Sequence, residues 1–282
     1  MDKLPITACI ITLNEEKNIQ ACLDSLDFVS EFVVVDSFSQ DKTRELCEQR
    51  GVRFFEHPFE GHIQQKNLAL SYASQPWVLA LDADERVSGN MREKIFEIFH
   101  SAPQECGFRF RRRTWYISRF ILHGRFYPDW QLRLFRKDSA CWAGKNPHDK
   151  IELSGSCKDV KADILHYSYA DVSGHVKTLN SFSSIQARNL YNENRRGFVI
   201  AKMCIKSFWA FVDSYFLRRG LLDGREGFIV ACFAAVSMFV RYAKLYELTV
   251  LANKSDGGGA REWDQTVANS VEPSWEDKRR IT

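Results

Sequence analysis

Carboxylates that follow apolar segments are the residues of this sequence with the plainest chemistry. Asp82 and Asp84 come directly after the apolar run WVLAL, and Asp36 ends the run EFVVVD. Residues two apart in an extended chain project to the same side, so Asp82 and Asp84 can approach one cation together. Carboxylate oxygens suit Mg²⁺ or Mn²⁺, which keep further positions for the phosphates of a substrate. The alternative is a solvated turn, which is common for an isolated D-x-D.

A further candidate is Asp129, the one acid among eight arginines and one lysine between residues 109 and 137. This stretch carries a charge of +8 and the whole chain +3, so the remainder sums to −5. Nearby positive charge favours the ionised form of a carboxylate, which is the form a general base requires. Alternatively, Asp129 is a structural partner of Arg125 or Arg133.

Alternating strands and helices must position these groups over the first hundred residues. We expect strands at 6–13, 31–36, 52–56 and 77–82, and helices at 15–28, 41–50, 62–73 and 89–100. Asn14 and Ser88 are the expected N-caps of the first and last of these helices. The alternation predicts a doubly wound α/β sheet, which binds its ligand at the carboxyl ends of the strands.

The pattern changes after residue 102. Aromatic- and arginine-rich strands are expected over 103–170, helices with apolar spacing over 171–252, and a loose polar tail over 253–282. The helical segment mixes many aromatic residues with the basic pair Arg218 and Arg219. It is expected either to lie in a membrane interface or to pack against the catalytic domain or another subunit.

Composition excludes several classes of protein. With 282 residues, 45% hydrophobic and 27% charged, the chain has material for a sizeable core and is not a disordered sequence. Its eight cysteines include no C-x-x-C pair, which argues against zinc and for a reduced, cytosolic location. No Walker loop or G-x-G-x-x-G is present, and neither a signal peptide nor about 20 uninterrupted apolar residues is found.

Four motifs in order resemble the N-terminal half of family 2 glycosyltransferases: ITACIITLNEEKNI, VVVDSFSQDKT, QQKNLAL and WVLALDADE. Those enzymes invert the anomeric centre and have the glycosyltransferase A fold. The resemblance therefore implies a Rossmann-like, mostly parallel sheet with helices on both faces, here with a helical C-terminal extension. HGRFYPDWQLRLFRK, LHYSYAD and LRRGLLDGREGF are similar to a subgroup that builds the inner core of lipopolysaccharide.

The resemblance also implies roles for individual residues. Residues 1–102 would bind the nucleotide sugar and metal, and 103–170 would complete the catalytic domain with the acceptor site. The implied nucleotide-sugar contacts are Thr12, Asn14, Glu15, Asp36, Lys66, Asn67, Asp82 and Ala83. The implied metal ligands are Asp84, Asp82 and His148, and the implied catalytic base is Asp129. The family's acid pair after the second strand is here Asp36-Ser37, and Asp149 replaces the subgroup's usual Glu.

An acceptor with phosphates and acidic sugars would suit arginine, which binds both groups bidentately. The expected acceptor contacts are Arg111, Arg113, Arg125, Gln131 and Arg133. Alternatively, alternate arginines simply lie on the solvated face of their strands. A nucleic-acid partner is not expected, because the acidic strand ends already indicate an enzyme.

The sequence thus predicts a metal-dependent inverting glycosyltransferase. It would transfer a hexose, glucose from UDP-glucose, to a heptose of the lipopolysaccharide inner core, with Mg²⁺ or Mn²⁺ bound. The alternatives are the same chemistry on a peptide, a teichoic acid or another lipid-linked glycan, and a non-catalytic sugar-nucleotide-binding protein. The expected location is cytoplasmic and peripheral on the inner face of the cell membrane, and an oligomer is possible.

Overall fold

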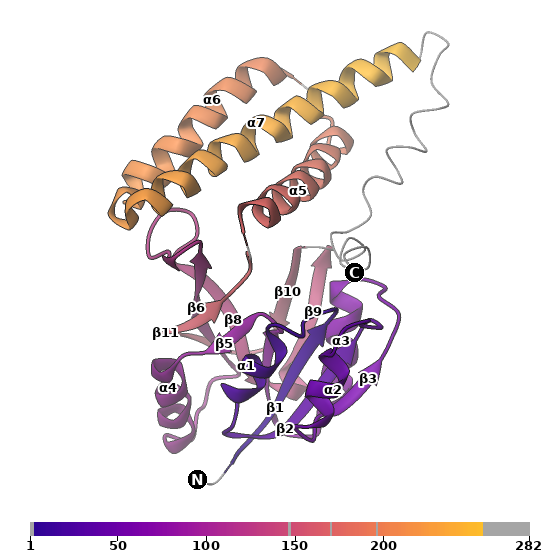
Figure 1. Ribbon diagram of the computed structural model, residues 1–282, viewed down its shortest axis with the longest axis vertical. Helices are drawn as coiled ribbons and strands as arrows, with labels where there is room; N and C mark the ends of the chain where they lie inside the picture. The colour runs from indigo at the N-terminus through magenta and orange to yellow at the C-terminus, as the bar shows by residue number, and fades with distance from the viewer. Residues whose placement is uncertain (1–2, 146–147, 170, 196, 256–282) are drawn as a thin grey trace. The chain divides into compact units, whose positions relative to one another are not determined.

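The computed structural model describes residues 3–145, 148–169, 171–195 and 197–255 (Figure 1). The chain forms two compact units. Unit 1 holds Met1–Thr114 and Pro128–Ser168, and unit 2 holds Trp115–Tyr127 and Tyr169–Thr282. The loose tail expected over 253–282 lies outside the described residues from 256 onward.

Unit 1 contains the alternating strands and helices. In chain order these are β1 (Leu4–Thr12), α1 (Ile19–Asp24), β2 (Val29–Asp36), α2 (Thr43–Glu48), β3 (Arg53–Glu56), α3 (His62–Tyr72), β4 (Trp77–Asp82), β5 (Glu85–Val87), α4 (Gly89–His100), β6 (Gly107–Tyr116), β8 (Asp129–Arg136), η1 (Lys137–Ser139), β9 (Ala140–Lys145), β10 (His148–Leu153) and β11 (Cys157–His166). The last two residues of β6 belong to unit 2.

The sheet of unit 1 has the strand order β3-β2-β1-β4-β8-β6-β11-β5. The first four strands are parallel, β8 runs antiparallel to both of its neighbours, and β11 is again parallel to β6. Within this register Thr12 lies opposite Asp36, and Ile11 lies opposite Asp82. The predicted α/β class is confirmed, and the ends of β1, β2 and β4 meet at one edge.

Helices cover both faces of this sheet, as expected (Figure 1). On one face α1, α2 and α4 pack through Ile19, Cys47 and Ile95, among others. On the other face α3 packs through Ala69 beside Trp142, a residue of the antiparallel β9–β10 hairpin. Strands buried on both sides are typical of parallel sheets, which explains why β1 and β4 read as continuous apolar runs.

The first helix differs from the prediction. α1 begins later than expected, and Asn14 is a loop residue with φ of 52°. Its N–H donates to Ser39 Oγ (2.8 Å), and its Oδ1 accepts the N–H of Gln40 (2.8 Å). Asparagine tolerates the left-handed region, so Asn14 joins two loops instead of capping a helix. The predicted Ser88 cap is confirmed, since its Oγ accepts the N–H of Met91 (3.1 Å).

Unit 2 is mainly helical. Its elements are β7 (Arg119–Phe120), α5 (Val172–Asn192), α6 (Val199–Val212), η2 (Asp213–Leu217), η3 (Gly220–Asp223) and α7 (Gly224–Ser255). The three long helices pack around Ala187, Tyr242 and Leu245. By length and composition alone, the helical stretch Gly220–Ala252 could cross a membrane, and 22% of its most apolar window is buried.

Candidate active site

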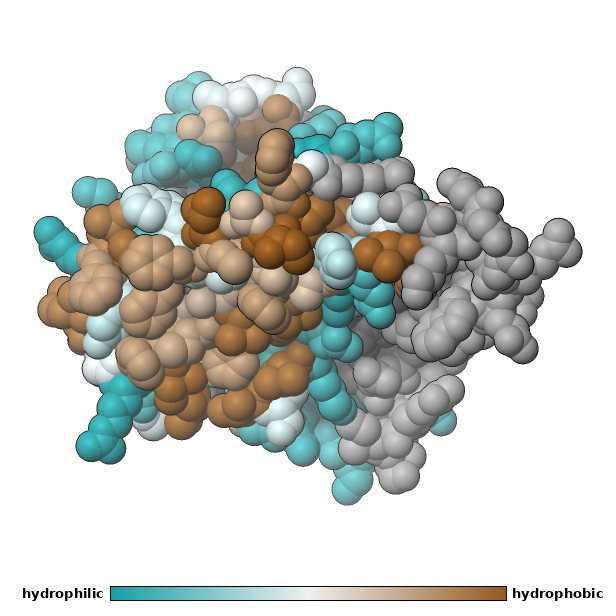
Figure 2. All heavy atoms as spheres, turned by 90° about the horizontal axis from the view of Figure 1, so that it is seen from above, coloured by the Kyte–Doolittle hydropathy of each residue, from teal (hydrophilic) through white to brown (hydrophobic). Residues whose placement is uncertain are grey.

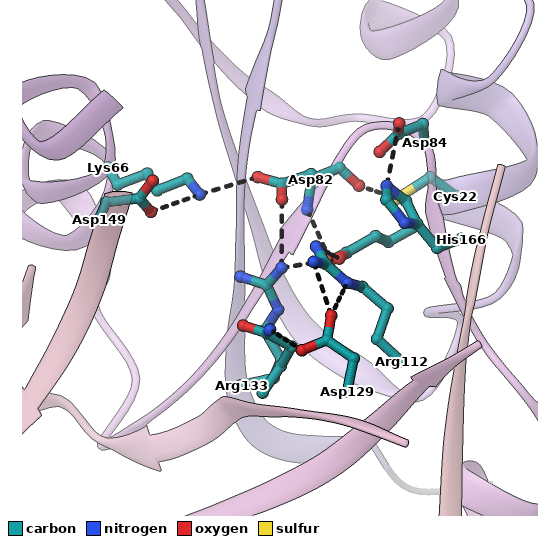
Figure 3. A network of polar contacts seen from close by, with 11 residues as sticks. Cys22, Lys66, Asp82, Asp84, Arg112, Asp129, Arg133, Asp149 and His166 are labelled. Atoms are coloured by element: carbon teal, nitrogen blue, oxygen red, sulfur yellow. Dashed lines mark hydrogen bonds and ion pairs between the residues drawn. The ribbon is translucent and has the colours of Figure 1, made fainter. Parts of the chain in front are cut away.

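Asp82, at the end of β4, lies between two cations of unit 1 (Figure 3). Its Oδ1 is 3.0 Å from Lys66 Nζ, and its Oδ2 is 3.1 Å from Arg133 Nη2. Burial acts to raise the pKa of Asp82, but the charges of Lys66, Arg133 and Arg112 outweigh it and hold the pKa well below its usual range. Asp82 therefore stays ionised.

Glu85 joins this aspartate to the middle of the sheet. Its side chain is fully buried, and its Oε2 accepts the backbone N–H of Asp82 (3.1 Å). Its Oε1 accepts hydrogen bonds from Arg133 (2.7 Å) and Arg112 (3.3 Å). Charge-assisted bonds of this kind compensate the loss of hydration that burial imposes on all three groups. Glu85 thus fixes the turn after β4 relative to β6 and β8.

Asp129, the predicted base, begins β8 and pairs with Arg112 of β6 (Figure 3). Its Oδ2 lies 2.9 Å from Nε and 2.8 Å from Nη2 of Arg112, and its Oδ1 accepts a bond from Gln131 (2.8 Å). Neither Arg125 nor Arg133, the partners considered from the sequence, is the residue that holds it. The side chain of Asp129 is still 36% exposed, so a substrate hydroxyl can reach it.

Asp84 faces His166, the last residue of β11 (Figure 3). His166 Nε2 lies 3.3 Å from Asp84 Oδ2. Burial acts to lower the pKa of His166, but the Asp84 carboxylate outweighs this and raises it. Two ligands of one Mn²⁺ or Mg²⁺, each at about 2.1 Å, lie about 3 Å apart when they are adjacent in an octahedron. The two atoms are therefore close enough to bind one divalent cation once His166 has lost its proton.

The fit for a metal rests on these two side chains. Asp82 is paired with Lys66 and Arg133, whereas Asp84 of the turn and His166 of β11 place a carboxylate and an imidazole side by side. Among the described residues, no group of three or more His, Cys, Asp or Glu side chains could hold a metal ion. A bound cation would therefore take its remaining ligands from a substrate and water.

Thr12 and Asp36 lie at the ends of β1 and β2, beside the same edge. Thr12 is buried, and its Oγ1 has no hydrogen-bond partner among the described residues. Asp36 accepts bonds from the N–H (2.6 Å) and Oγ (2.5 Å) of Ser39. Burial raises the pKa of Asp36, and the bonds from Ser39 partly offset this. An unpartnered buried hydroxyl beside this carboxylate is a polar surface that a nucleoside could complete.

Lys66 and Asn67 of α3 both contact the β9–β10 hairpin. Lys66 Nζ lies 2.9 Å from Asp149 Oδ2 and 4.5 Å from the centre of the Trp142 ring. Asn67 exchanges two hydrogen bonds with the backbone of Trp142, at 2.8 and 2.9 Å. Lys66, Asp82, Arg133 and Trp142 line a pocket at this edge. Asn67 thus holds the hairpin in place, while Lys66 presents its charge to the pocket.

Three further predicted residues are Glu15, Ala83 and His148. The backbone N–H of Glu15 donates to Thr43 Oγ1 (2.9 Å), and Ala83 is buried in the turn after β4. His148 is the first residue of β10, but its side chain lies outside the part of the chain that the structure describes.

The predicted acceptor arginines are paired with carboxylates of several elements. Arg111 and Arg113 both pair with Asp163 of β11, the former at 3.0 Å. Arg133 belongs to the network around Asp82, and Arg125 lies in unit 2, where its Nε is 2.9 Å from Asp213 Oδ2. The stretch that is so basic in sequence is therefore largely paired with carboxylates of other strands and helices.

Sequence reasoning missed three residues of this site. His166 lies in the motif LHYSYAD, which the resemblance included without giving the histidine a role. Glu85 follows the two aspartates directly, but its complete burial depends on strands that come later in the chain. Arg112 was one arginine among eight, and only its register opposite Asp129 distinguishes it.

Comparison with known proteins agrees with this architecture. Residues 7–152 match the family described as Glycosyl transferase family 2. The lipopolysaccharide core biosynthesis glycosyltransferase LpsC of Rhizobium meliloti (strain 1021) is 31% identical over 253 residues, 87% of this chain and 93% of LpsC. An uncharacterized glycosyltransferase of Rickettsia bellii (strain RML369-C) is 28% identical over 260 residues, 88% of each chain.

Among solved structures, S. aureus TarS 1–349 in complex with UDP-GlcNAc aligns with a TM-score of 0.44 and 15% identity, over 93% of each chain. The family match spans more than half of the chain, and the similarity to LpsC extends over most of both proteins. The family match and the similarity to LpsC, together with the mixed sheet, indicate the glycosyltransferase A type of fold and confirm the predicted class of enzyme. The chain belongs to glycosyl transferase family 2.

Proposed function

We propose that this glycosyltransferase is metal-dependent and inverting, and that it moves a hexose from a UDP-sugar, UDP-glucose in the first instance, to a heptose of the lipopolysaccharide inner core. The observation that carries the chemistry is the continuous network from Asp82 through Arg133, Glu85 and Arg112 to Asp129. It connects a carboxylate on the donor edge to one that is accessible to an acceptor. The identity to LpsC over 87% of the chain supports the acceptor class.

The donor would lie at the ends of β1, β2 and β4. Thr12 and Asp36 offer a hydroxyl and a carboxylate to the nucleoside, because both lie at this edge. Lys66 and Arg133, which pair with Asp82 at this edge, would turn part of their charge-assisted bonding to the diphosphate of a bound donor. Asp84 and His166 would hold the Mg²⁺ or Mn²⁺ ion. When bound, such an ion neutralises charge that develops on the leaving diphosphate.

Asp129 would remove the proton from the acceptor hydroxyl as its oxygen attacks the anomeric carbon. Arg112 binds Oδ2 of the carboxylate through both Nε and Nη2, and Gln131 binds Oδ1. A carboxylate oxygen has two lone pairs, so Oδ1, with its single partner, keeps one for the substrate proton. Attack from the face opposite to UDP converts the α-linked donor into a β-linked product.

The proposed place of action is the cytoplasmic side of the cell membrane. The acceptor is attached to lipid, and its core sugars are added while it lies in the inner leaflet. A cytoplasmic enzyme with a UDP-sugar donor can reach it only there.

The test is a matrix of UDP-sugars and truncated lipopolysaccharide acceptors, with products read by mass spectrometry. UDP-glucose with a heptose-terminated core should add one hexose, in a β-linkage by NMR, and EDTA should stop the reaction. Transfer only to a peptide, a teichoic acid or another lipid-linked glycan would keep the chemistry and overturn the acceptor. UDP-sugar binding without transfer to any acceptor would indicate a non-catalytic protein.

A further inference from the structure

Unit 2 exposes an unusually apolar surface along α6, η2, η3 and the beginning of α7. Its largest exposed side chains are Phe198 (86% exposed), Phe208 (69%), Ile205 (66%), Leu217 (61%) and Trp209 (53%). Figure 2, which views the molecule from the side of α6 and α7, shows apolar side chains gathered over these helices. A soluble surface rarely carries a continuous apolar area of this kind unless it binds something.

The charges on this surface are mainly basic. Between residues 198 and 245, all of which the structure describes, the exposed charged side chains are Lys206, Arg218, Arg219 and Arg225. The three acids of the same stretch all have partners: Asp223 is fully buried, Asp213 pairs with Arg125 and Arg218, and the partly exposed Glu226 accepts a hydrogen bond from Ser118 Oγ (2.7 Å). Large apolar and aromatic side chains with a basic margin are typical of helices that lie in the interface of an anionic bilayer.

We propose that α6, η2, η3 and the first turns of α7 bind the surface of an anionic lipid bilayer, with the apolar side chains inserted below the phosphates. The basic side chains Lys206, Arg219 and Arg225 then lie at the level of the headgroups. A second copy of this chain is a poorer occupant, because a symmetric pair of these surfaces would bring like charges together.

Contacts of α5 indicate that α7 lies on the membrane rather than crossing it. Lys244 of α7 donates through Nζ to the carbonyl oxygen of Asn180 (2.7 Å) and to the hydroxyls of Ser183 (2.9 Å) and Ser184 (2.7 Å). These three residues belong to α5, which carries few exposed apolar residues and many polar ones. If α7 crossed the bilayer, this polar helix would enter the hydrocarbon with it, at a high cost.

The inference rests on the proposed function only in the source of the membrane, and its test is separate. The full-length chain is mixed with sucrose-loaded vesicles of phosphatidylcholine alone, or with one third phosphatidylglycerol, and the sedimented fraction is measured. We expect binding to the anionic vesicles, weakened by 0.5 M NaCl, and release of bound protein by alkaline carbonate.

Paired variants identify the surface. Arg219→Gln with Arg225→Gln should weaken the partition by about fivefold for each arginine. Phe208→Gln with Leu217→Gln should weaken it by about tenfold or more, through lost apolar burial. The matched controls are Lys158→Gln with Lys161→Gln on β11 of unit 1, which should change nothing, and Val176→Gln on α5, which is 47% exposed and should also change nothing.

Several results would overturn the inference. The first is failure of the intact chain to bind anionic vesicles, and the second is undiminished binding by both double variants of the surface. The third is resistance to carbonate, which would mean that α7 spans the bilayer. A dimer in sedimentation velocity that Phe208→Gln dissociates would assign the surface to a second copy. Transfer to a deacylated, soluble core oligosaccharide should be unchanged in every variant. Its absence from the intact chain would contradict the proposed function and leave the membrane surface standing.

Discussion

Nε and Nη2 of Arg112 lie 2.9 and 2.8 Å from the same carboxylate oxygen, Oδ2, of Asp129. Burial acts to lower the pKa of Arg112, but Glu85 and Asp129 outweigh it and raise the pKa, so the guanidinium stays charged. Because Glu85 also accepts from Arg133, the position of the proposed base depends on the same buried carboxylate as the position of Asp82. Glu85 therefore positions both the proposed base and the proposed donor site.

Replacing Asp129 by Asn should remove transfer and leave donor binding intact. The amide has nearly the same size but cannot take up the hydroxyl proton, so kcat should fall by about 10²- to 10⁴-fold. UDP affinity, measured by calorimetry with Mn²⁺ present, should stay within about twofold, since Asp129 contacts Arg112 and Gln131, neither of which is a proposed donor contact. Asp138→Asn, in the exposed segment η1, is the control and should keep full activity. An equal loss of UDP affinity in the Asp129 variant would make this residue structural.

The basic stretch around Asp129 is less basic in space than it is in sequence. Seven of its eight arginines form ion pairs: Arg109, Arg111, Arg112, Arg113, Arg119, Arg125 and Arg133. Their carboxylates come from β4, β5, β8, β11, η2 and η3, up to about a hundred residues away. Charge summed along a chain does not report charge in space, because strand order decides which groups meet. The predicted concentration of positive charge for the acceptor is therefore mostly neutralised.

Local signals predicted the first half of the fold well. The run WVLALD, residues 77–82, is β4 to the residue, and Ser88 with its following amphipathic stretch gives α4. Both depend on burial and capping patterns that are visible in a few neighbouring residues. Asn14 failed because its conformation is set by the loop at residues 39–40, which is distant in sequence. The contact of His166 with Asp84 could not be predicted for the same reason, since the strand order of the sheet, and not the local sequence, brings β11 to Asp84.

Metal binding should depend on Asp84 and His166 together. Asp84→Asn and His166→Gln should each weaken UDP binding in the presence of Mn²⁺ by about 10- to 100-fold, because each removes a ligand or its orienting partner. UDP binding in EDTA should change little. Calorimetry with UDP and electron paramagnetic resonance of Mn²⁺ measure the two effects. If both variants bound Mn²⁺–UDP like the intact chain, this pair would not be the metal site.

Glu85→Gln should destabilise unit 1 strongly. The substitution leaves Arg133, whose side chain is 4% exposed, with one fewer carboxylate in a buried setting. Removing one partner of a buried ion pair costs about 3–5 kcal/mol. Urea unfolding followed by circular dichroism measures this loss. Glu97→Gln, in an exposed pair with Lys94, should change the free energy of unfolding by no more than about 0.5 kcal/mol. A small effect of Glu85→Gln would show that the arginines find other partners.

The stability of unit 2 should fall as the pH falls, because of His175. Burial lowers the pKa of His175 to about 4, and its Nδ1 lies 2.9 Å from the hydroxyl of Tyr116. Below pH 6.5 His175 takes up a proton in the unfolded chain but stays neutral in the folded unit, so the free energy of unfolding declines down to about pH 4. Relative to His175→Phe, the intact chain should lose about 2 kcal/mol between pH 6.5 and pH 5, measured by urea unfolding at each pH. Tyr116→Phe should keep this pH dependence, since burial and not the hydroxyl is the cause. If the free energy of unfolding varied with pH in the same way for the intact chain and for His175→Phe, His175 would not be the responsible group.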